Sequence, residues 1–188
     1  MTSKPEIIKN PLFEIIGKCG DSLNVETFVI GGWVRDSILK RNTKEIEFDI
    51  VCEGNGILLA KKVAEKLKLK NIAIYKNFGT AAILYKNIKI EFNGARKESY
   101  TKNSRNPKVE KGSIKDDQKR RDFTINAMSV KLNKKGFGEF IDPFNGINDI
   151  EKKIIRTPLD PIKTYDDDPL RMIRAIRFAS ILNFEIEK

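Results

Sequence analysis

Two acidic residues, Glu47 and Asp49, give the clearest chemical signal in the sequence. They lie in a segment, 45–52, that alternates charged with apolar residues, as a strand with one polar face does. Residues i and i+2 of a strand project from the same face, so the two carboxylates are expected to form a Mg²⁺ site. Two such ions could activate a 3′ hydroxyl and stabilise the pyrophosphate that leaves a triphosphate. For an isolated pair of acids, a solvated strand edge is the commoner explanation.

A third carboxylate, Glu91, lies on a further expected strand, 88–92. Its polar face could join Glu47 and Asp49 in the same cluster. Simple exposure of Glu91 to solvent is an equally good interpretation at this point.

A diglycine turn, Gly31-Gly32, stands between an expected strand, 27–30, and an expected helix, 34–39. Glycines at such a turn let backbone N–H groups approach phosphate oxygens, and the start of the helix adds a favourable dipole. Arg35, one turn into the helix, can grip a phosphate with its planar guanidinium. Taken alone, a plain strand-to-helix turn explains the pattern better. For the acidic pair just downstream, the presence of this turn reverses the balance in favour of a metal site.

Arginines are grouped in two later segments. Arg120 and Arg121 precede Asp122 at the start of an expected short helix, 123–130, where they could hold triphosphate or RNA phosphates while Asp122 caps the helix. A second helix is expected over 169–182, with Asp168 as its cap and Pro169 at its first position.

Arginines at i, i+3 and i+6 form one ridge of this second helix, and they are Arg171, Arg174 and Arg177. Asp168 lies on the same side as Arg171. An acceptor beside a two-pronged donor can hydrogen-bond the Watson–Crick edge of a base, so the helix could select nucleotides without a template. A capped surface helix whose arginines pair with nearby acids is the alternative.

Composition narrows the chemistry further. The 188 residues contain no histidine, which excludes Ser-His and Cys-His nucleophiles and histidine-bound zinc within this sequence. A formal net charge of +10 suits a partner rich in phosphate, although a Lys-rich soluble surface is an equal alternative. Two separated cysteines, Cys19 and Cys52, indicate core thiols in a reducing cytoplasm. Without a secretion signal or a membrane-length apolar run, we expect a soluble, intracellular protein that contacts no membrane.

The remaining elements follow from periodicity. Helices are expected over 11–19, 57–69 and 148–152, and strands over 72–75, 81–85 and 139–141, with Lys86-Asn87 as a tight hairpin turn. Residues 95–119 are polar and predict a mobile substrate loop or a disordered segment. Together these elements predict an α+β protein with a mixed sheet. Because nothing ends the architecture after the last helix, the chain is expected to be a fragment of a longer polypeptide, with a natural short form as the alternative.

Six segments in order, from Phe28 to Phe184, resemble one known family: GGWVRD, EFDIV, FNGARKESY, RRDFTINAM, FIDPFNG and DDPLRMIRAIRFA. The chain is similar to the bacterial-type (class II) tRNA nucleotidyltransferases and poly(A) polymerases of the DNA polymerase beta superfamily. The resemblance implies a polymerase-beta-like palm, or head, over residues 1–157. It also implies the beginning of a helical neck over 158–188.

The resemblance also implies residue roles. Magnesium would bind at Glu47 and Asp49, the triphosphate at Gly32, Arg35 and Arg121, and the base of an incoming CTP or ATP at Asp168 and Arg171. Arg174 would lie close to the phosphates or the ribose. The partner would be the 3′ end of a tRNA or another RNA.

One departure concerns the acid pair. The family usually has aspartate at both positions, whereas the first acid here is Glu47, and the spacer from Gly32 is about two residues longer than is common. Counting forward from the glycines selects Glu45 and Glu47, while counting back from 50–52 selects Glu47 and Asp49. The second alignment is preferred because the downstream match is closer. A longer glutamate side chain can still bind metal, but an impaired active site is also compatible with this change.

The expected activity is transfer of CMP and AMP to the 3′ end of tRNA with release of pyrophosphate. A poly(A) polymerase, or an enzyme that adds only C or only A, is a related alternative. A non-catalytic RNA-binding module is the alternative from another functional class. A second departure from the family, the absence of helical body and tail regions, predicts weak RNA binding by this chain alone.

Overall fold

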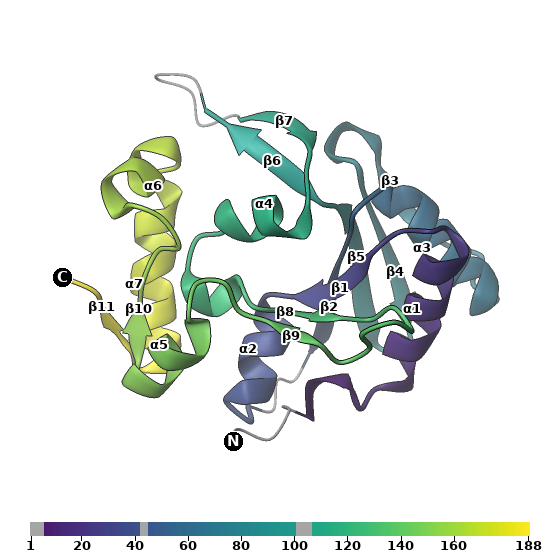
Figure 1. Cartoon of the computed structure of the whole chain (residues 1–188), viewed down its shortest axis with the longest axis horizontal. Helices are drawn as coiled ribbons and strands as arrows, with labels where there is room; N and C mark the ends of the chain where they lie inside the picture. The colour runs from purple at the N-terminus through teal and green to yellow at the C-terminus, as the bar shows by residue number, and fades with distance from the viewer. Residues whose placement is uncertain (1–5, 42–44, 101–106) are drawn as a thin grey trace. The chain divides into compact units, whose positions relative to one another are not determined.

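A computed structural model describes residues 6–41, 45–100 and 107–188 of the chain (Figure 1). Contacts divide the chain into two compact units, Met1–Ala95 with Ser129–Ile141 and Arg96–Met128 with Asp142–Lys188. The first unit contains the acid pair and the diglycine turn, and the second contains both arginine segments. Among the described residues, no helix is long and apolar enough to cross a bilayer. The division into head and neck near residue 157 stays a prediction.

A seven-stranded mixed sheet forms the first unit, with strand order β3-β4-β5-β2-β1-β8-β9. Among the strands that the structure describes, β2 and β5 are parallel neighbours, and the other neighbouring pairs of this sheet are antiparallel. This sheet confirms the predicted α+β class. The strand bounds are β1 (Thr27–Ile30), β2 (Ile46–Cys52), β3 (Ala73–Tyr75), β4 (Thr80–Tyr85), β5 (Ile88–Gly94), β8 (Ser129–Lys131) and β9 (Phe140–Ile141).

The main helices of the first unit begin at asparagine caps. Asn10 accepts the N–H of Leu12 at 3.0 Å at the start of α1 (Pro11–Ser22), and Asn55 accepts two N–H groups at the start of α3 (Gly56–Lys66). The two helices pack together, and α3 covers β4 and β5 on one face of the sheet (Figure 1). The shorter helices are η1 (Glu6–Ile8), α2 (Gly32–Ile38) and η2 (Lys76–Phe78).

Aromatic packing fixes α1 and α2 against the centre of the sheet. The ring of Phe48, which is fully buried on β2, lies 4.6 Å from the ring of Phe13 and 4.7 Å from that of Trp33. The indole of Trp33 also donates a hydrogen bond to the carbonyl of Ile7 at 3.1 Å. Because Phe48 lies between Glu47 and Asp49, its burial directs both acids to the opposite face of β2.

The second unit is built from helices and two short strand pairs. Strand β6 (Arg96–Ser99) pairs antiparallel with β7 (Lys108–Lys111), and β10 (Ile154–Ile155) pairs parallel with β11 (Glu185–Ile186). Its helices are α4 (Ile114–Lys119), η3 (Thr124–Asn126), α5 (Gly146–Lys152), α6 (Pro161–Asp167) and α7 (Leu170–Leu182). Helix α6 was not predicted from the sequence, although Asp160 caps it by accepting the N–H of Lys163 at 2.9 Å.

Two expectations about local structure were wrong. The polar segment 95–119 is not a featureless loop, because it contains β6, β7 and α4; its residues 101–106 lie outside the described part of the chain. The helix expected over 123–130 is a single 3-10 turn, η3, followed by strand β8. Pairing of Ser129 and Val130 with β1 replaces the helical hydrogen bonds that local sequence favoured.

Other expectations about local structure were confirmed. The order of β1, diglycine turn and α2 is as predicted, with α2 beginning two residues earlier. Lys86 and Asn87 form the predicted hairpin turn with left-handed backbones, at φ 46° and 65°. Cys19 and Cys52 are both buried free thiols, and burial raises the pKa of Cys52 to about 12.

Candidate active site

The three predicted carboxylates of the first unit form one cluster. Glu47 and Asp49 project from the same face of β2, and the register places Asp49 directly opposite Glu91 on the parallel strand β5. One carboxylate oxygen from each of Glu47, Asp49 and Glu91 lies within 4.8 Å of the other two. The structure therefore brings together the residues that the sequence singled out, and Glu91 belongs with the pair.

The geometry of this acid cluster fits magnesium. Mg²⁺ prefers carboxylate oxygens at about 2.1 Å, so two oxygens bound to one ion lie at most about 4.2 Å apart. The oxygens of the cluster lie within 4.8 Å of one another, and side-chain rotation of the half-exposed Glu47 can bring them to the separation that one ion needs. The donor set contains only hard oxygen ligands, which suits magnesium better than zinc or copper.

A lysine that was not among the predicted site residues lies against the acid cluster. The ammonium of Lys89, between Ile88 and Ile90 on β5, lies 2.5 Å from a carboxylate oxygen of Glu47 and 3.7 Å from one of Glu91. The hydrogen bond to Glu47 raises the pKa of Lys89. A cation of the protein thus already lies against two of the carboxylates. The period-two pattern of β5, which places Lys89 and Glu91 on one face, was the signal for it.

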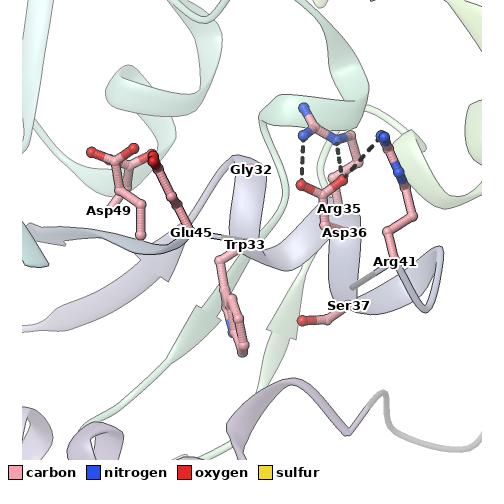
Figure 2. A pocket seen from close by; sticks show the side chains of 9 residues that line it. Gly32, Trp33, Arg35, Asp36, Ser37, Arg41, Glu45 and Asp49 are labelled. Atoms are coloured by element: carbon pink, nitrogen blue, oxygen red, sulfur yellow. Dashed lines mark hydrogen bonds and ion pairs between the residues drawn. The ribbon is translucent and has the colours of Figure 1, made fainter. Parts of the chain in front are cut away.

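A pocket of about 240 Å³ adjoins the acid cluster and reaches the diglycine turn. Figure 2 shows Glu45 and Asp49 on one side of Gly32, with the Arg35, Asp36 and Arg41 group on the other. The full lining is Gly32, Trp33, Arg35, Asp36, Ser37, Arg41, Glu45, Glu47 and Asp49. Typical small-molecule sites measure about 300–1,000 Å³, so this pocket suits the phosphates of a nucleotide more than a whole nucleotide.

The two glycines of the turn have different structural demands. Gly31 has φ 82° and ψ −130°, a backbone conformation that a side chain would strain. Gly32 has no such demand, since a Cβ atom there would meet only Arg35 Nη2, at an ordinary 3.7 Å. The fold therefore requires a glycine at 31. At 32 the missing side chain keeps the floor of the pocket open.

The guanidinium of Arg35 is buried in the wall of this pocket. Its Nε and Nη2 donate to the two carboxylate oxygens of Asp36, at 3.0 and 2.8 Å (Figure 2). Arg41 lies 3.7 Å from the same carboxylate. Asp36 thus holds two arginines beside the diglycine turn, a role that the sequence reading did not give it.

Glu45, the alternative first acid, lies before β2 and lines the pocket, and the cluster of three acids that could share a metal does not include it. The structure thus groups Glu47 with Asp49 and Glu91. This grouping agrees with the alignment that counts back from residues 50–52.

The arginines of the RRD segment belong to a buried ion network in the second unit. Asp117, which is fully buried on α4, lies 2.6 Å from Arg120 and 3.2 Å from Arg121. Arg120 also pairs with Glu98, at 3.3 Å. These arginines follow α4, so their expected position at a helix start was wrong. Asp122 accepts hydrogen bonds from the N–H of Phe123 and from the side chain of Asn126, which agrees with a local capping role.

The arginines of α7 are also engaged within the second unit. Arg171 Nη2 donates to the hydroxyl of Tyr100 at 3.3 Å and to the carbonyl of Arg120 at 3.0 Å. Arg174 pairs with Asp122 at 2.7 Å and lies over the ring of Phe178. Asp168 accepts the N–H of Leu170 at the start of the helix. The sequence did not identify Tyr100 or the carbonyl of Arg120 as the groups that orient Arg171. Both residues lie within segments that resemble the family, FNGARKESY and RRDFTINAM.

A model of the poly(A) polymerase head domain matches residues 27–156, more than half of the chain. The chain belongs to the poly(A) polymerase head-domain family. The A-adding tRNA nucleotidyltransferase of Aquifex aeolicus (strain VF5) is 41% identical to the chain over 164 residues. That match covers 87% of this chain and 19% of the relative.

Solved structures agree with this family assignment. A CCA-adding enzyme in an apo form is 38% identical, with a TM-score of 0.85, and the match covers 95% of this chain and 42% of that one. A tRNA nucleotidyltransferase complexed with a primer tRNA and an incoming ATP analog is 36% identical, with a TM-score of 0.78. That match covers 92% of this chain and 46% of the other. The predicted family and the nucleotidyltransferase fold are confirmed, and the chain spans less than half the length of these relatives.

Proposed function

We propose that this chain is the catalytic head, with the beginning of a neck from residue 158, of an enzyme that adds nucleotides to the 3′ end of tRNA. The observation that carries this proposal is the cluster of Glu47, Asp49 and Glu91 on one sheet face beside the Gly32 pocket. The names of its relatives supply the substrates, CTP or ATP and tRNA. The buried free thiols support the proposed setting, a reducing cytoplasm.

Phosphoryl transfer requires little covalent chemistry from the protein, because catalysis depends on position and charge. The 3′ oxygen of the RNA forms a bond to the α phosphorus, the bond from that phosphorus to the bridging oxygen breaks, and pyrophosphate leaves with the electron pair. Glu47 and Asp49 would hold magnesium, which supplies positive charge to the reacting oxygens when bound. We assign Glu91, on the β5 side of the cluster, to receive the proton of the 3′ hydroxyl.

The pocket beside the carboxylates suits the triphosphate. Gly32 leaves its floor open, and Arg35 places a guanidinium in its wall, oriented by Asp36. A guanidinium matches phosphate oxygens with paired hydrogen bonds. We therefore assign phosphate contacts to Gly31, Gly32 and Arg35, and a further phosphate contact to Arg121.

Nucleotide selection is assigned to the start of α7. Asp168 lies two residues before α7 in an extended conformation, and Arg171 is the second residue of that helix. The contacts of Arg171 with Tyr100 and the Arg120 carbonyl fix its guanidinium. A fixed donor near a carboxylate can read the edge of a base without a template. Arg174, paired with Asp122, is assigned to the phosphates or ribose.

One related activity is favoured by a specific observation. The relative from Aquifex aeolicus is named an A-adding enzyme, whereas the solved structure with TM-score 0.85 is named a CCA-adding enzyme. Addition of AMP alone is therefore the second candidate. An incubation with labelled CTP or ATP separates the two activities when two tRNAs are compared. One tRNA lacks all three CCA nucleotides, and the other lacks only the final A.

The decisive experiment compares the wild-type chain with Asp49→Ala in this incorporation assay, with magnesium present. We expect labelled RNA from the wild type and none above background from Asp49→Ala, while tRNA retention on a filter stays nearly unchanged. Persistent incorporation by Asp49→Ala would refute the metal assignment. Retention of RNA by the wild type without any incorporation would instead favour the non-catalytic RNA-binding alternative.

A further inference from the structure

The face of the sheet that carries the acid cluster continues across β4 to the edge strand β3. Glu91 is paired across strands with Ala82 on β4, and Ala82 is paired with Ala73 on β3. Directly paired residues share a face, so Asp49, Glu91, Ala82 and Ala73 form one row. Small side chains thus lead from the carboxylates to the edge of the sheet.

Larger apolar side chains flank this row of small residues. Leu84, paired with Lys89 on the Glu47 side of the row, is 66% exposed. Tyr75, paired with Thr80 on the other side, is 52% exposed. The hydrogen bond from Thr80 to Asn93 at 2.6 Å confirms that β4 and β5 present these residues on a common face.

The opposite face of β4 and β5 is covered. Ala81, Ile83, Ile90 and Phe92 are buried, and α3 packs on β4 and β5. On β4 the exposed large apolar residue, Leu84, therefore lies on the face that bears the acids, whereas the edge strand β3 exposes both Tyr75 and, at 37%, Ile74 on the opposite face. Exposed apolar groups that gather within a polar rim are a mark of binding surfaces.

Basic and aromatic residues border the same surface. Lys76 and Phe78 lie in the turn between β3 and β4, where Phe78 is 73% exposed, and Lys86 lies in the turn between β4 and β5. Flat apolar groups on which bases stack, interleaved with lysines that neutralise phosphates, are what single-stranded nucleic acid binds.

We propose that the surface of Ala73, Tyr75, Ala82 and Leu84 binds the last unpaired nucleotides at the 3′ end of the RNA substrate. This proposal rests on the proposed function and specifies where its RNA lies. The Gly32 pocket adjoins Asp49 from the β1 side of β2, whereas Glu91 and this surface lie on the β5 side. The two substrates therefore approach the carboxylates from opposite sides, as an attack on the α phosphorus requires.

The dimensions of the surface agree with this occupant. Neighbouring strands are about 4.8 Å apart, so the row from Glu91 to Ala73 spans roughly 10 Å. Stacked bases are spaced about 3.4 Å apart along a strand, so two or three nucleotides fit in this length. The terminal nucleotide would lie at Glu91, and the preceding ones would contact Leu84 and Tyr75.

The test measures the binding of two RNA minihelices to the 188-residue chain without triphosphate, one with three unpaired 3′ nucleotides and one with a blunt end. The wild type should prefer the first by about tenfold or more, since stacking of each base adds substantially to affinity. In the Tyr75→Ala/Leu84→Ala variant the preference should fall to about twofold or less.

A matched variant, Ile74→Ala/Leu58→Ala, controls for truncation of exposed apolar groups. Ile74 alternates with Tyr75 on β3, and Leu58 is 52% exposed on α3, which covers the opposite face. This control should keep the wild-type preference. Affinity for ATP should be equal in all three proteins, because the pocket beside Gly32 is unaltered.

The outcomes distinguish this proposal from the proposed function. If Tyr75→Ala/Leu84→Ala retains the preference, or if the wild type has none, the surface is wrong even when nucleotide incorporation is observed. If the preference is lost in that variant but no protein incorporates nucleotides, the surface stands and the enzymatic function fails. A concentration-dependent dimer that the variant dissociates, with RNA preference unchanged, would assign the β3 edge to a second copy of the chain and overturn the proposal.

Discussion

Acidic residues in the two units of the chain have opposite surroundings. In the first unit the side chains of Glu47 and Glu91 are 49% and 33% exposed, and the cation beside them is the flexible ammonium of Lys89. In the second unit the side chains of Asp117 and Glu98 are 0% and 5% exposed, and arginines surround them.

This difference in exposure and pairing suits the acids of the first unit to a ligand and those of the second unit to a structural role. Carboxylates that lie together near solvent repel each other, and a divalent cation relieves that repulsion. A buried carboxylate already neutralised by two arginines has little capacity for another cation, but its loss leaves buried charges unpaired. Substitution of an acid of the first unit's cluster should therefore alter activity, and substitution of a buried acid of the second unit's network should alter stability.

The largest expected effect is on the activity of Glu91→Gln. Loss of one carboxylate from the cluster should lower nucleotide incorporation by at least about a thousandfold, or roughly 4 kcal/mol of transition-state stabilisation. The free energy of unfolding should change little, because Glu91 is partly exposed. Single-turnover incorporation and urea unfolding measure the two quantities.

Glu45→Gln is the matched control, since Glu45 lines the pocket from outside the cluster. It should reduce incorporation far less than Glu91→Gln does. A larger loss in Glu45→Gln would favour the alternative acid pair, Glu45 with Glu47, and would remove the contrast between the two units.

Stability is the second quantity, and Asp117→Ala should lower the free energy of unfolding by about 3 kcal/mol. The substitution leaves Arg120 and Arg121 without the carboxylate that both contact. Urea unfolding followed by circular dichroism provides the measurement. Glu110→Gln, which removes an exposed ion pair with Lys108 in the same unit, should have no measurable effect. Equal stability of the two variants would contradict the structural role of Asp117.

The sequence predicted the grouping of the three carboxylates in the first unit because these residues follow strand periodicity. Glu47 and Asp49 are directed by the alternation of β2, and β5 repeats that alternation around Glu91. The position of Lys89 required knowledge that β2 and β5 are parallel neighbours in register. The sequence of either strand alone does not show which strand it pairs with or in which register.

The predictions for segment 95–119 in the second unit were wrong because ion pairs determine its local structure. Residues 95–119 have few apolar side chains, yet Glu98 and Asp117 organise Arg96, Arg120 and Arg121 around them. Hydrophobic periodicity cannot detect such a network. Helix α6 was a different error, because Asp160-Pro161 gives the same start signal as Asp168-Pro169, but a short helix has too few turns to show a pattern.

Tyr100→Phe has a smaller expected effect, a loss of about 1 kcal/mol in the free energy of unfolding near pH 8. The variant removes the hydrogen bonds of the Tyr100 hydroxyl with Glu98 and Arg171. Burial, with Glu98 adding to it, raises the pKa of Tyr100 to about 12. Since the unfolded pKa is about 10, the folded state holds this proton more tightly, and its contribution is complete below pH 10 and lost towards pH 12.

Unfolding of the wild type and Tyr100→Phe at several pH values tests this dependence. The advantage of the wild type should be constant up to about pH 10 and should shrink as the pH rises towards 12. An advantage that grows over this range would contradict the surroundings of Tyr100. Relaxed selectivity between CTP and ATP in the same variant would connect the buried network to the position of Arg171.

The smallest effect concerns Lys89→Met. Because the Lys89 ammonium lies against Glu47 and Glu91, it repels a divalent cation at the same carboxylates, and its removal should raise affinity for Mn²⁺ by about threefold. Titration of free Mn²⁺ by electron paramagnetic resonance, without nucleotide, measures this affinity. Lys62→Met removes another exposed lysine that pairs with a carboxylate, Glu65 at 3.2 Å on α3, and should leave Mn²⁺ binding unchanged. Weaker Mn²⁺ binding in Lys89→Met would show that the lysine positions the carboxylates for metal. The acids of the first unit would then depend on a cation of the protein, as Asp117 does in the second unit.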